Sequence, residues 1–196
     1  MDVKDIGFEG LYDFERIHYL GYARKWRDVP KPSIAAVQGA CIAAGLMLCW
    51  PCDLIIAADN AYFSDPVVMM GIGGVEYHGH TWELGARKAK ELLFTGDAIT
   101  AEEAERLGMI NRVVPLDELE TQTMALAQRI AQKPAWGLRT AKRAVNKTLD
   151  IMGQYAAMQA VFDTHWLGHA NAIAQTGYPA LADLEKMEKA NKKKES

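Results

Sequence analysis

The sequence predicts an α/β fold in which a strand-rich part, residues 1–115, is followed by a helical part, residues 116–196. Two observations predict this division. Short apolar segments bounded by turn residues, typical of buried strands, lie before residue 115, whereas helical patterns run almost without a break from residue 117 onward. With 196 residues, of which 49% are hydrophobic, the chain is large enough to bury a substantial core.

The strand-rich part is expected to contain a first helix over Asp13–Trp26, because apolar residues recur there at helical spacing and the pattern ends before Pro30. An apolar strand is predicted over Ser33–Val37, and further strands over Leu54–Ala57 and from Ala61. The remaining elements expected here are a loop over Val67–Gly74, helices from near Glu76 and from near Ala86 to Phe94, a capped helix from Thr100 to Gly108, and a short strand at Arg112–Val114.

The helical part is expected to hold four helices. Proline stands in the first turn of the second helix, where its missing N–H has no intrahelical partner to lose. The predicted helices are Asp117–Gln132, Pro134–Met152, Gln154–Ala174 and a last one after Pro179.

The segment Lys31–Pro66 carries the clearest functional signal, because small residues stand where a helix is predicted to begin. Small side chains let a ligand approach the backbone closely, and the first N–H groups of a helix have no partner within it. Together with the helix dipole, such donors can stabilise an oxygen that becomes negative during a reaction. The run Ala40, Ala43, Ala44 and Gly45 therefore predicts an oxyanion site built from backbone.

Several stretches of the sequence resemble the crotonase superfamily, also called the enoyl-CoA hydratase/isomerase family. They are KPSIAAVQG, the run of small residues, CDLIIAADNAYFSDP, the glycine-rich Gly71–Gly74 and TGDAITAEEAERLGMINRVVP. The resemblance implies a crotonase-like ββα spiral core, N-terminally truncated here, followed by C-terminal helices that pack subunits into trimers. It also implies an acyl-CoA substrate, with coenzyme A as part of that substrate and no separate cofactor.

The resemblance assigns one N–H of the oxyanion hole to Ala44, beside Gly45, although family members usually carry glycine at this position. The alternative is that Ala43–Gly45 only allow close packing of the helix on a strand. The second N–H, and contacts to the adenine of coenzyme A, are assigned to the segment Met1, Asp2, Val3 and Lys4, which resembles the matching family segment. Because family members have further strands ahead of this segment, a truncated start is expected rather than a fragment stabilised by oligomerisation.

The two glutamates that hydratases of this family use as acid and base fall, by the same resemblance, at Met47 and Val67, which cannot exchange a proton. Glu76 follows the glycine-rich loop, where some isomerases of the family carry a single catalytic carboxylate. One carboxylate can move a double bond by removing a proton from one carbon and returning it to another. We therefore expect isomerisation with Glu76 as the acid/base. The alternatives are a hydratase with a relocated acid/base, a non-catalytic subunit of the same fold, and a Glu76 that only favours the helix dipole.

Metal and redox sites are not predicted. His78 and His80 would face different sides of one helix, so surface or pocket-lining roles are expected for them. His165 and His169 share a face but have no acidic ligand motif nearby in the sequence, so a structural role is expected for this second pair. The pair in Cys49–Cys52 has the spacing C-x-x-C but no second pair, and buried reduced thiols are expected.

Charge and hydropathy exclude other classes of function. A net charge of −3 gives no electrostatic case for binding nucleic acid. No apolar run reaches the length of a membrane span, and the N-terminus lacks the layout of a signal peptide, so a cytoplasmic location is expected. The expected partners are therefore the acyl-CoA substrate and further copies of this chain, in a homotrimer or hexamer.

Overall fold

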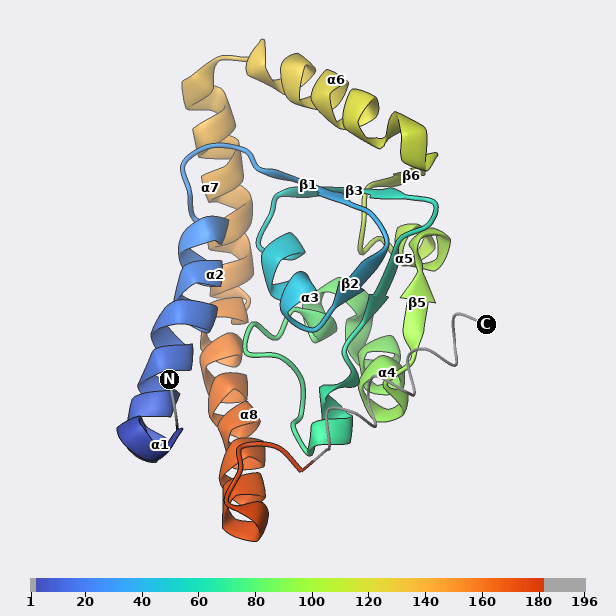
Figure 1. Cartoon of the computed structure of the whole chain (residues 1–196). Helices are drawn as coiled ribbons and strands as arrows, with labels where there is room; N and C mark the ends of the chain where they lie inside the picture. The colour runs from blue at the N-terminus through green and yellow to red at the C-terminus, as the bar shows by residue number, and fades with distance from the viewer. Residues whose placement is uncertain (1–2, 182–196) are drawn as a thin grey trace.

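The strands in the described part of the chain form two three-stranded sheets (Figure 1). The computed structural model describes residues 3–181. Its strands are β1 (Ile34–Val37), β2 (Ala40–Ile42), β3 (Leu54–Ala58), β4 (Tyr62–Ser64), β5 (Ala98–Thr100) and β6 (Arg112–Val114). The first sheet has the order β1-β3-β6 with all strands parallel, and the second has the order β2-β4-β5 with β4 and β5 antiparallel. The first four strands thus alternate between the sheets, which gives the core its spiral course.

The turn between β1 and β2 makes this alternation possible. Gly39 has a φ of +58°, which glycine adopts without steric cost, and its carbonyl accepts a hydrogen bond from the N–H of Tyr62 at the start of β4. The chain can therefore leave one sheet and enter the other within two residues. The predicted strands β1, β3, β4 and β6 are confirmed to within a residue or two, whereas β2 and β5, each three residues long, were not predicted.

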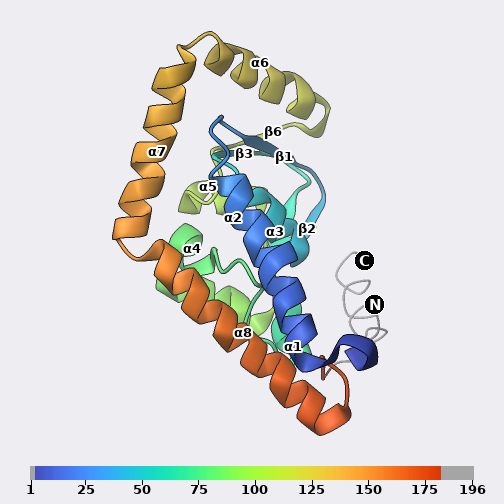
Figure 2. The same cartoon turned by 90° about the vertical axis from the view of Figure 1, so that its left-hand side faces the viewer.

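The N-terminal helices form one rod that lies beside the helix α8 (Gln154–Thr176) in both views (Figures 1 and 2). The rod consists of α1 (Val3–Glu15) after its kink at Gly7, a π-helical turn (Arg16–Leu20) and α2 (Gly21–Arg27). The backbone angles at Gly7 are non-helical, so the first turn of α1 runs at an angle to the rod (Figure 2). It begins well before Asp13, where the helix was predicted. Tertiary contacts explain the difference: the ring of Phe8 packs edge-to-face on Trp166 at 5.1 Å, and the hydroxyl of Tyr12 donates to Asp163 at 2.7 Å.

The described chain after β6 is helical except for short turns. A 3-10 turn (Leu116–Glu118) leads into α6 (Leu119–Ala131), α7 (Ala135–Ile151) and α8, so the first three predicted C-terminal helices are confirmed within a few residues. The helix predicted after Pro179 falls largely outside the described residues. Helix α6 covers the first sheet, where a small apolar cluster consists of Ile56, Ala58, Val114 and Leu119. None of the described helices combines the length and the hydropathy that crossing a membrane requires.

Three helices and a 3-10 turn connect the strands. They are α3 (Ala44–Cys49), a 3-10 turn (Pro66–Met70), α4 (His80–Thr95) and α5 (Ala101–Leu107). The predicted cap of α5 is confirmed, because the Thr100 hydroxyl accepts the N–H of Glu103 at 3.2 Å and Gly108 closes the helix with a φ of +81°.

The prediction of a helix beginning near Glu76 is wrong. Residues 71–79 form a loop, and α4 starts only at His80 and continues to Thr95. Gly85 interrupts α4 with a φ of +71° and a ψ of 161°, so the second predicted helix, from near Ala86 to Phe94, is confirmed as the part of α4 after this kink. Tertiary contacts hold this loop: the carboxylate of Asp65 accepts the N–H of Val75 at 2.9 Å, and a Cβ on Gly79 would lie 2.6 Å from the ring of Trp50. The interpretation of Glu76 as a first-turn residue is therefore also wrong.

Candidate functional site

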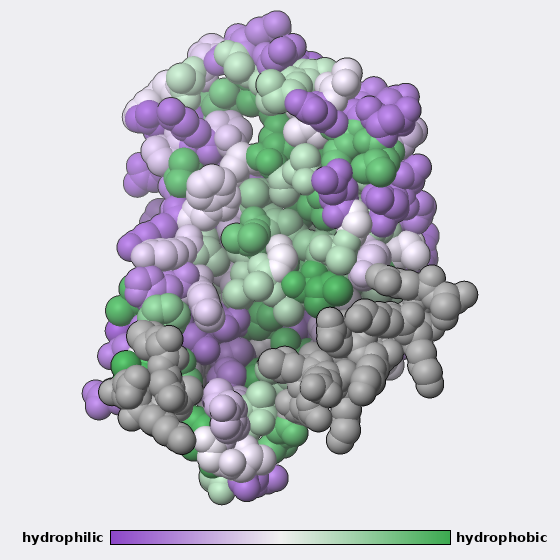
Figure 3. All heavy atoms as spheres, in the orientation of Figure 1, coloured by the Kyte–Doolittle hydropathy of each residue, from purple (hydrophilic) through white to green (hydrophobic). Residues whose placement is uncertain are grey.

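A cavity of about 1020 Å³ lies between α2, α3, the strands β1 and β2, and α8. Its walls are mainly apolar and include Tyr22, Ala36, Leu48, Met70 and Ile72. Figure 3 shows hydrophobic residues spread across the middle of this face, with hydrophilic residues concentrated toward its edges. A concave apolar site of this size suits a small organic ligand, with orientation set by the few polar groups in its wall.

The entrance to α3 forms one wall of the cavity. Ala43, with a φ of +47°, is the only non-glycine residue with positive φ within residues 3–181, and its N–H donates to the Ser64 carbonyl at 2.9 Å. Ala44 and Gly45 follow as the first residues of α3 and line the cavity. A backbone held in a strained conformation by a neighbouring strand can present the first N–H groups of the helix to a ligand.

Close packing at Gly45 is present as well. A Cβ on this residue would lie 3.2 Å from the Cys41 Sγ, so glycine lets α3 sit tightly on β2. The two interpretations of the small residues, close packing and an N–H donor site, are therefore compatible with one another. Cys41, Cys49 and Cys52 are free thiols, the first two buried.

Met47 and Val67 line the same cavity. The structure thus brings the two positions that the resemblance equates with hydratase glutamates to the place where a ligand would bind. Both present apolar surface, so any proton transfer in the cavity must come from other side chains.

Glu76 also lines the cavity, from the loop of residues 71–79, with 8% of the residue exposed. Burial raises the pKa of Glu76 above that of a free carboxyl, although the imidazole of His165, with its Nε2 3.9 Å from Glu76 Oε1, acts in the opposite direction. Such a carboxyl holds a proton more readily than an exposed one, which suits a group that must both remove and return protons.

The buried carboxylate of Asp65 anchors the loop that carries Glu76. Asp65 and His80 are both 0% exposed, and Asp65 Oδ2 lies 2.8 Å from His80 Nε2. The same carboxylate accepts the N–H of Val75 at 2.9 Å and that of Val67 at 3.4 Å. Asp65 therefore caps the 3-10 turn of Pro66–Met70 and in addition fixes the position next to Glu76.

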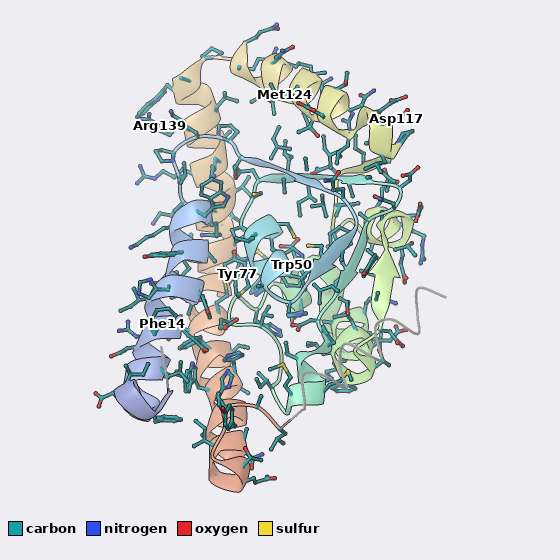
Figure 4. The ribbon with its side chains drawn as sticks, in the orientation of Figure 1. Phe14, Trp50, Tyr77, Asp117, Met124 and Arg139 are labelled. Atoms are coloured by element: carbon teal, nitrogen blue, oxygen red, sulfur yellow. The ribbon has the colours of Figure 1, made fainter. Side chains whose placement is uncertain are left out.

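Aromatic rings complete this anchor. The ring of Trp50 packs edge-on against His80 with 4.7 Å between the ring centres, and the ring of His78 lies 4.6 Å from that of His80. Figure 4 shows Trp50 and Tyr77 in the middle of the molecule, far from the labelled Asp117 and Arg139 on the C-terminal segments. His78 and His80 thus lie close together, contrary to the expectation that they face different sides of a helix.

One group of residues in the cavity wall was missed by the sequence analysis. Glu15, the last residue of α1, meets His165 and His169 of α8, and the three side chains bring one ligand atom each within 4.8 Å of one another. The sequence has no acidic ligand motif beside the two histidines, but the fold places the carboxylate of Glu15 against them. Their spacing was the only signal in the sequence, because Glu15 belongs to the opposite end of the chain.

Helix α8 reaches the cavity by passing very close to the loop after the 3-10 turn. A Cβ on Gly168 would lie 2.7 Å from the carbonyl oxygen of Gly71 and 3.0 Å from the Cα of Ile72. Only glycine therefore allows this approach. It brings His165 close enough for its Nδ1 to lie 2.6 Å from the Gly74 carbonyl oxygen.

The structure describes only part of the N-terminal segment that is predicted to bind the substrate. Met1 and Asp2 lie outside the described residues, and Val3 and Lys4 form the start of α1. Their role in substrate binding stays a prediction. Of the other predicted site residues, the structure brings Ala44, Gly45 and Glu76 to one cavity.

Comparisons with known proteins give a consistent result. The family model described as enoyl-CoA hydratase/isomerase matches residues 2–186. The putative enoyl-CoA hydratase EchA13 of Mycobacterium tuberculosis is 48% identical over 172 residues, which are 87% of this chain and 54% of that protein. This chain spans little more than half the length of the curated relatives it matches.

Two solved structures are similar over most of the described fold. A probable enoyl-CoA hydratase from Mycobacterium smegmatis has a TM-score of 0.89 and 65% identity, covering 90% of this chain and 72% of that one. A monofunctional enoyl-CoA isomerase from M. smegmatis has a TM-score of 0.59 and 36% identity, covering 65% of this chain and 61% of that one.

Proposed function

Because the chain belongs to the enoyl-CoA hydratase/isomerase family, we propose that it acts on enoyl-CoA thioesters and moves their double bond. One observation supports this proposal above the others, namely which residues line the cavity. They are Ala44 at the start of α3, Glu76 with its buried carboxyl, and apolar side chains at the two positions equated with hydratase glutamates. Coenzyme A enters as part of the substrate.

The reaction uses Glu76 twice. As a carboxylate, Glu76 removes a proton from the carbon next to the thioester, and the electron pair of that C–H bond spreads over the alkene and the carbonyl. The carbonyl oxygen becomes negative and accepts hydrogen bonds from the backbone near Ala44. Protonated Glu76 then delivers its proton two carbons further along the chain, and the double bond comes to rest beside the thioester.

A second candidate, hydration with a relocated acid/base, is favoured by one specific observation. Glu15 lines the same cavity as Glu76, and His165 Nε2 lies 3.5 Å from Glu15 Oε2 and 3.9 Å from Glu76 Oε1. Two carboxyls are what general acid and general base catalysis of water addition requires. The names of the curated relatives also fit this alternative.

Separate assays with 3-enoyl-CoA and 2-enoyl-CoA decide between the two. We expect a higher kcat/KM for the gain of conjugated-enoyl absorbance from 3-enoyl-CoA than for its loss from 2-enoyl-CoA. Glu15→Gln should leave the double-bond shift in place, because Glu76 alone performs it. Turnover of 2-enoyl-CoA alone, lost in Glu15→Gln, would establish hydration instead.

We also propose that the protein assembles as a homotrimer or hexamer. In support, α7 has no buried residue in the single chain and exposes Trp136, Val145 and Ile151 by 69%, 61% and 85%. Sedimentation equilibrium should therefore give three or six times the mass of the chain, and Ile151→Glu should lower that mass. A monomer at micromolar concentration would contradict the proposal.

A further inference from the structure

The proposed double-bond shift uses Glu76 but leaves a second polar group in the cavity without a task. Glu15, His165 and His169 are 8%, 4% and 8% exposed, in walls that are otherwise mainly apolar. Burying a carboxylate and two imidazoles is unfavourable unless they are paired. These three side chains therefore need a partner that compensates for their burial.

The hydrogen bonds of the two histidines determine which ring nitrogen is available. His165 Nδ1 lies 2.6 Å from the carbonyl oxygen of Gly74, and His169 Nδ1 lies 2.6 Å from that of Pro179. A carbonyl oxygen only accepts hydrogen bonds, so both Nδ1 atoms carry hydrogen. In the neutral rings both Nε2 atoms then present a lone pair, which is the arrangement found in histidines that ligate metals.

These lone pairs converge on one another and on a carboxylate oxygen. The two Nε2 atoms are 3.0 Å apart, and Glu15 Oε2 lies 3.5 Å from one and 3.7 Å from the other. Glu15 Oε2 is buried and has no hydrogen-bond partner. With both rings neutral, three acceptor atoms converge in a buried place, and a cation held among them would stabilise this arrangement. A proton shared by the imidazoles would leave the carboxylate oxygen beyond hydrogen-bonding distance.

A metal ion satisfies all three atoms at once. A triangle with sides of 3.0, 3.5 and 3.7 Å has a point about 2.0 Å from each corner, and Zn²⁺ binds nitrogen and carboxylate oxygen at ~2.0–2.2 Å. We propose that Glu15, His165 and His169 form a binding site for a divalent transition-metal ion of the Zn²⁺ type. Two nitrogen donors favour such ions over Mg²⁺ and Ca²⁺, which prefer oxygen alone.

The site has consequences for the cavity. Because all three ligands line it, a coordination position not filled by protein would face the bound molecule. The ion would also engage the carboxylate of Glu15 and leave Glu76 as the free carboxylate. This inference departs from the expectation that no metal binds, and it does not depend on the proposed reaction, since binding is measured without substrate.

The test is direct titration of the chelator-treated protein with Zn²⁺ by calorimetry, and with Co²⁺ by visible absorption. We expect one ion per chain, and a loss of affinity of about 100-fold or more in His169→Gln and in His165→Gln. The matched control is His18→Gln, because His18 lies in the same cavity wall but outside the cluster, and its affinity should equal that of the wild type.

A variant that does not fold would fail to bind the metal for that reason alone. A measurement on the wild type therefore provides an independent test. X-ray absorption at the zinc edge of the loaded protein should show two imidazoles and an oxygen ligand at ~2.0–2.2 Å. Failure to bind one ion per chain, or an unchanged affinity in folded His169→Gln, would overturn the proposal and leave a shared proton as the occupant. The double-bond assay is unaffected by that outcome, so the two proposals fail separately.

Discussion

Replacing Glu76 by glutamine is expected to lower kcat for the double-bond shift by about 100-fold or more. Glutamine keeps the size and shape of the side chain but cannot accept a proton from carbon. Because Glu76 is buried in the cavity wall, a water molecule would be a poor substitute for the lost carboxylate as the proton acceptor. The measurement is steady-state turnover of 3-enoyl-CoA, with binding of a saturated acyl-CoA expected to stay within a few-fold of the wild type.

Glu120→Gln provides the matched control, because Glu120 is an exposed glutamate in the first turn of α6 and does not line the cavity. Its turnover should equal that of the wild type. The pH profile adds a second criterion. Burial raises the pKa of Glu76, and the proton-accepting form is lost as the pH falls, so the acid limb of kcat/KM should lie above that of an ordinary carboxyl. Unchanged turnover in Glu76→Gln would refute the assignment.

Removing the carboxylate of Asp65 is expected to destabilise the fold by about 2–5 kcal/mol, because it leaves the backbone N–H groups of Val67 and Val75 without their acceptor and opens space beside the buried imidazole of His80. Asp65 and His80 are fully buried and 2.8 Å apart, and Asp65 also accepts the N–H of Val75. The free energy of unfolding of Asp65→Ala, measured by urea titration, should fall by this amount.

The control is Asp13→Ala, which removes an exposed ion pair with Arg16 at 2.9 Å and should change the free energy of unfolding by less than about 1 kcal/mol. Asp65→Asn keeps one acceptor oxygen and should fall between the two variants. It serves as the measurement if Asp65→Ala does not fold. A loss of less than about 1 kcal/mol in Asp65→Ala would show that the carboxylate does not anchor the loop.

The elements that the sequence predicted well are those with a local physical cause. The apolar runs of β1 and β3, the Thr100 cap of α5 and the long periodic helices α6 to α8 depend mainly on neighbouring residues. The start of α1 and the delayed start of α4 depend on contacts with distant residues such as Trp166 and Trp50, which no local pattern reveals.

The same distinction applies to the site. The segment at Ala44 could be predicted because its small residues are consecutive, and Glu76 because it follows a glycine-rich loop. Glu15 could not be linked to His165 and His169, because an isolated glutamate on an amphipathic helix resembles any solvated one. Only the packing of α1 against α8 brings them together.

The glycine at position 168 has a consequence for how this cavity can diverge among related chains. Because Gly168 has no side chain, α8 can pass directly against the loop at Gly71, and a single methyl group at this position would push the two segments apart. The resulting shift would change the position of His165 and His169 on α8 relative to the loop that carries Glu76, while leaving every polar residue of the site the same. The geometry of the polar site therefore depends on Gly168, a residue that takes no part in the chemistry.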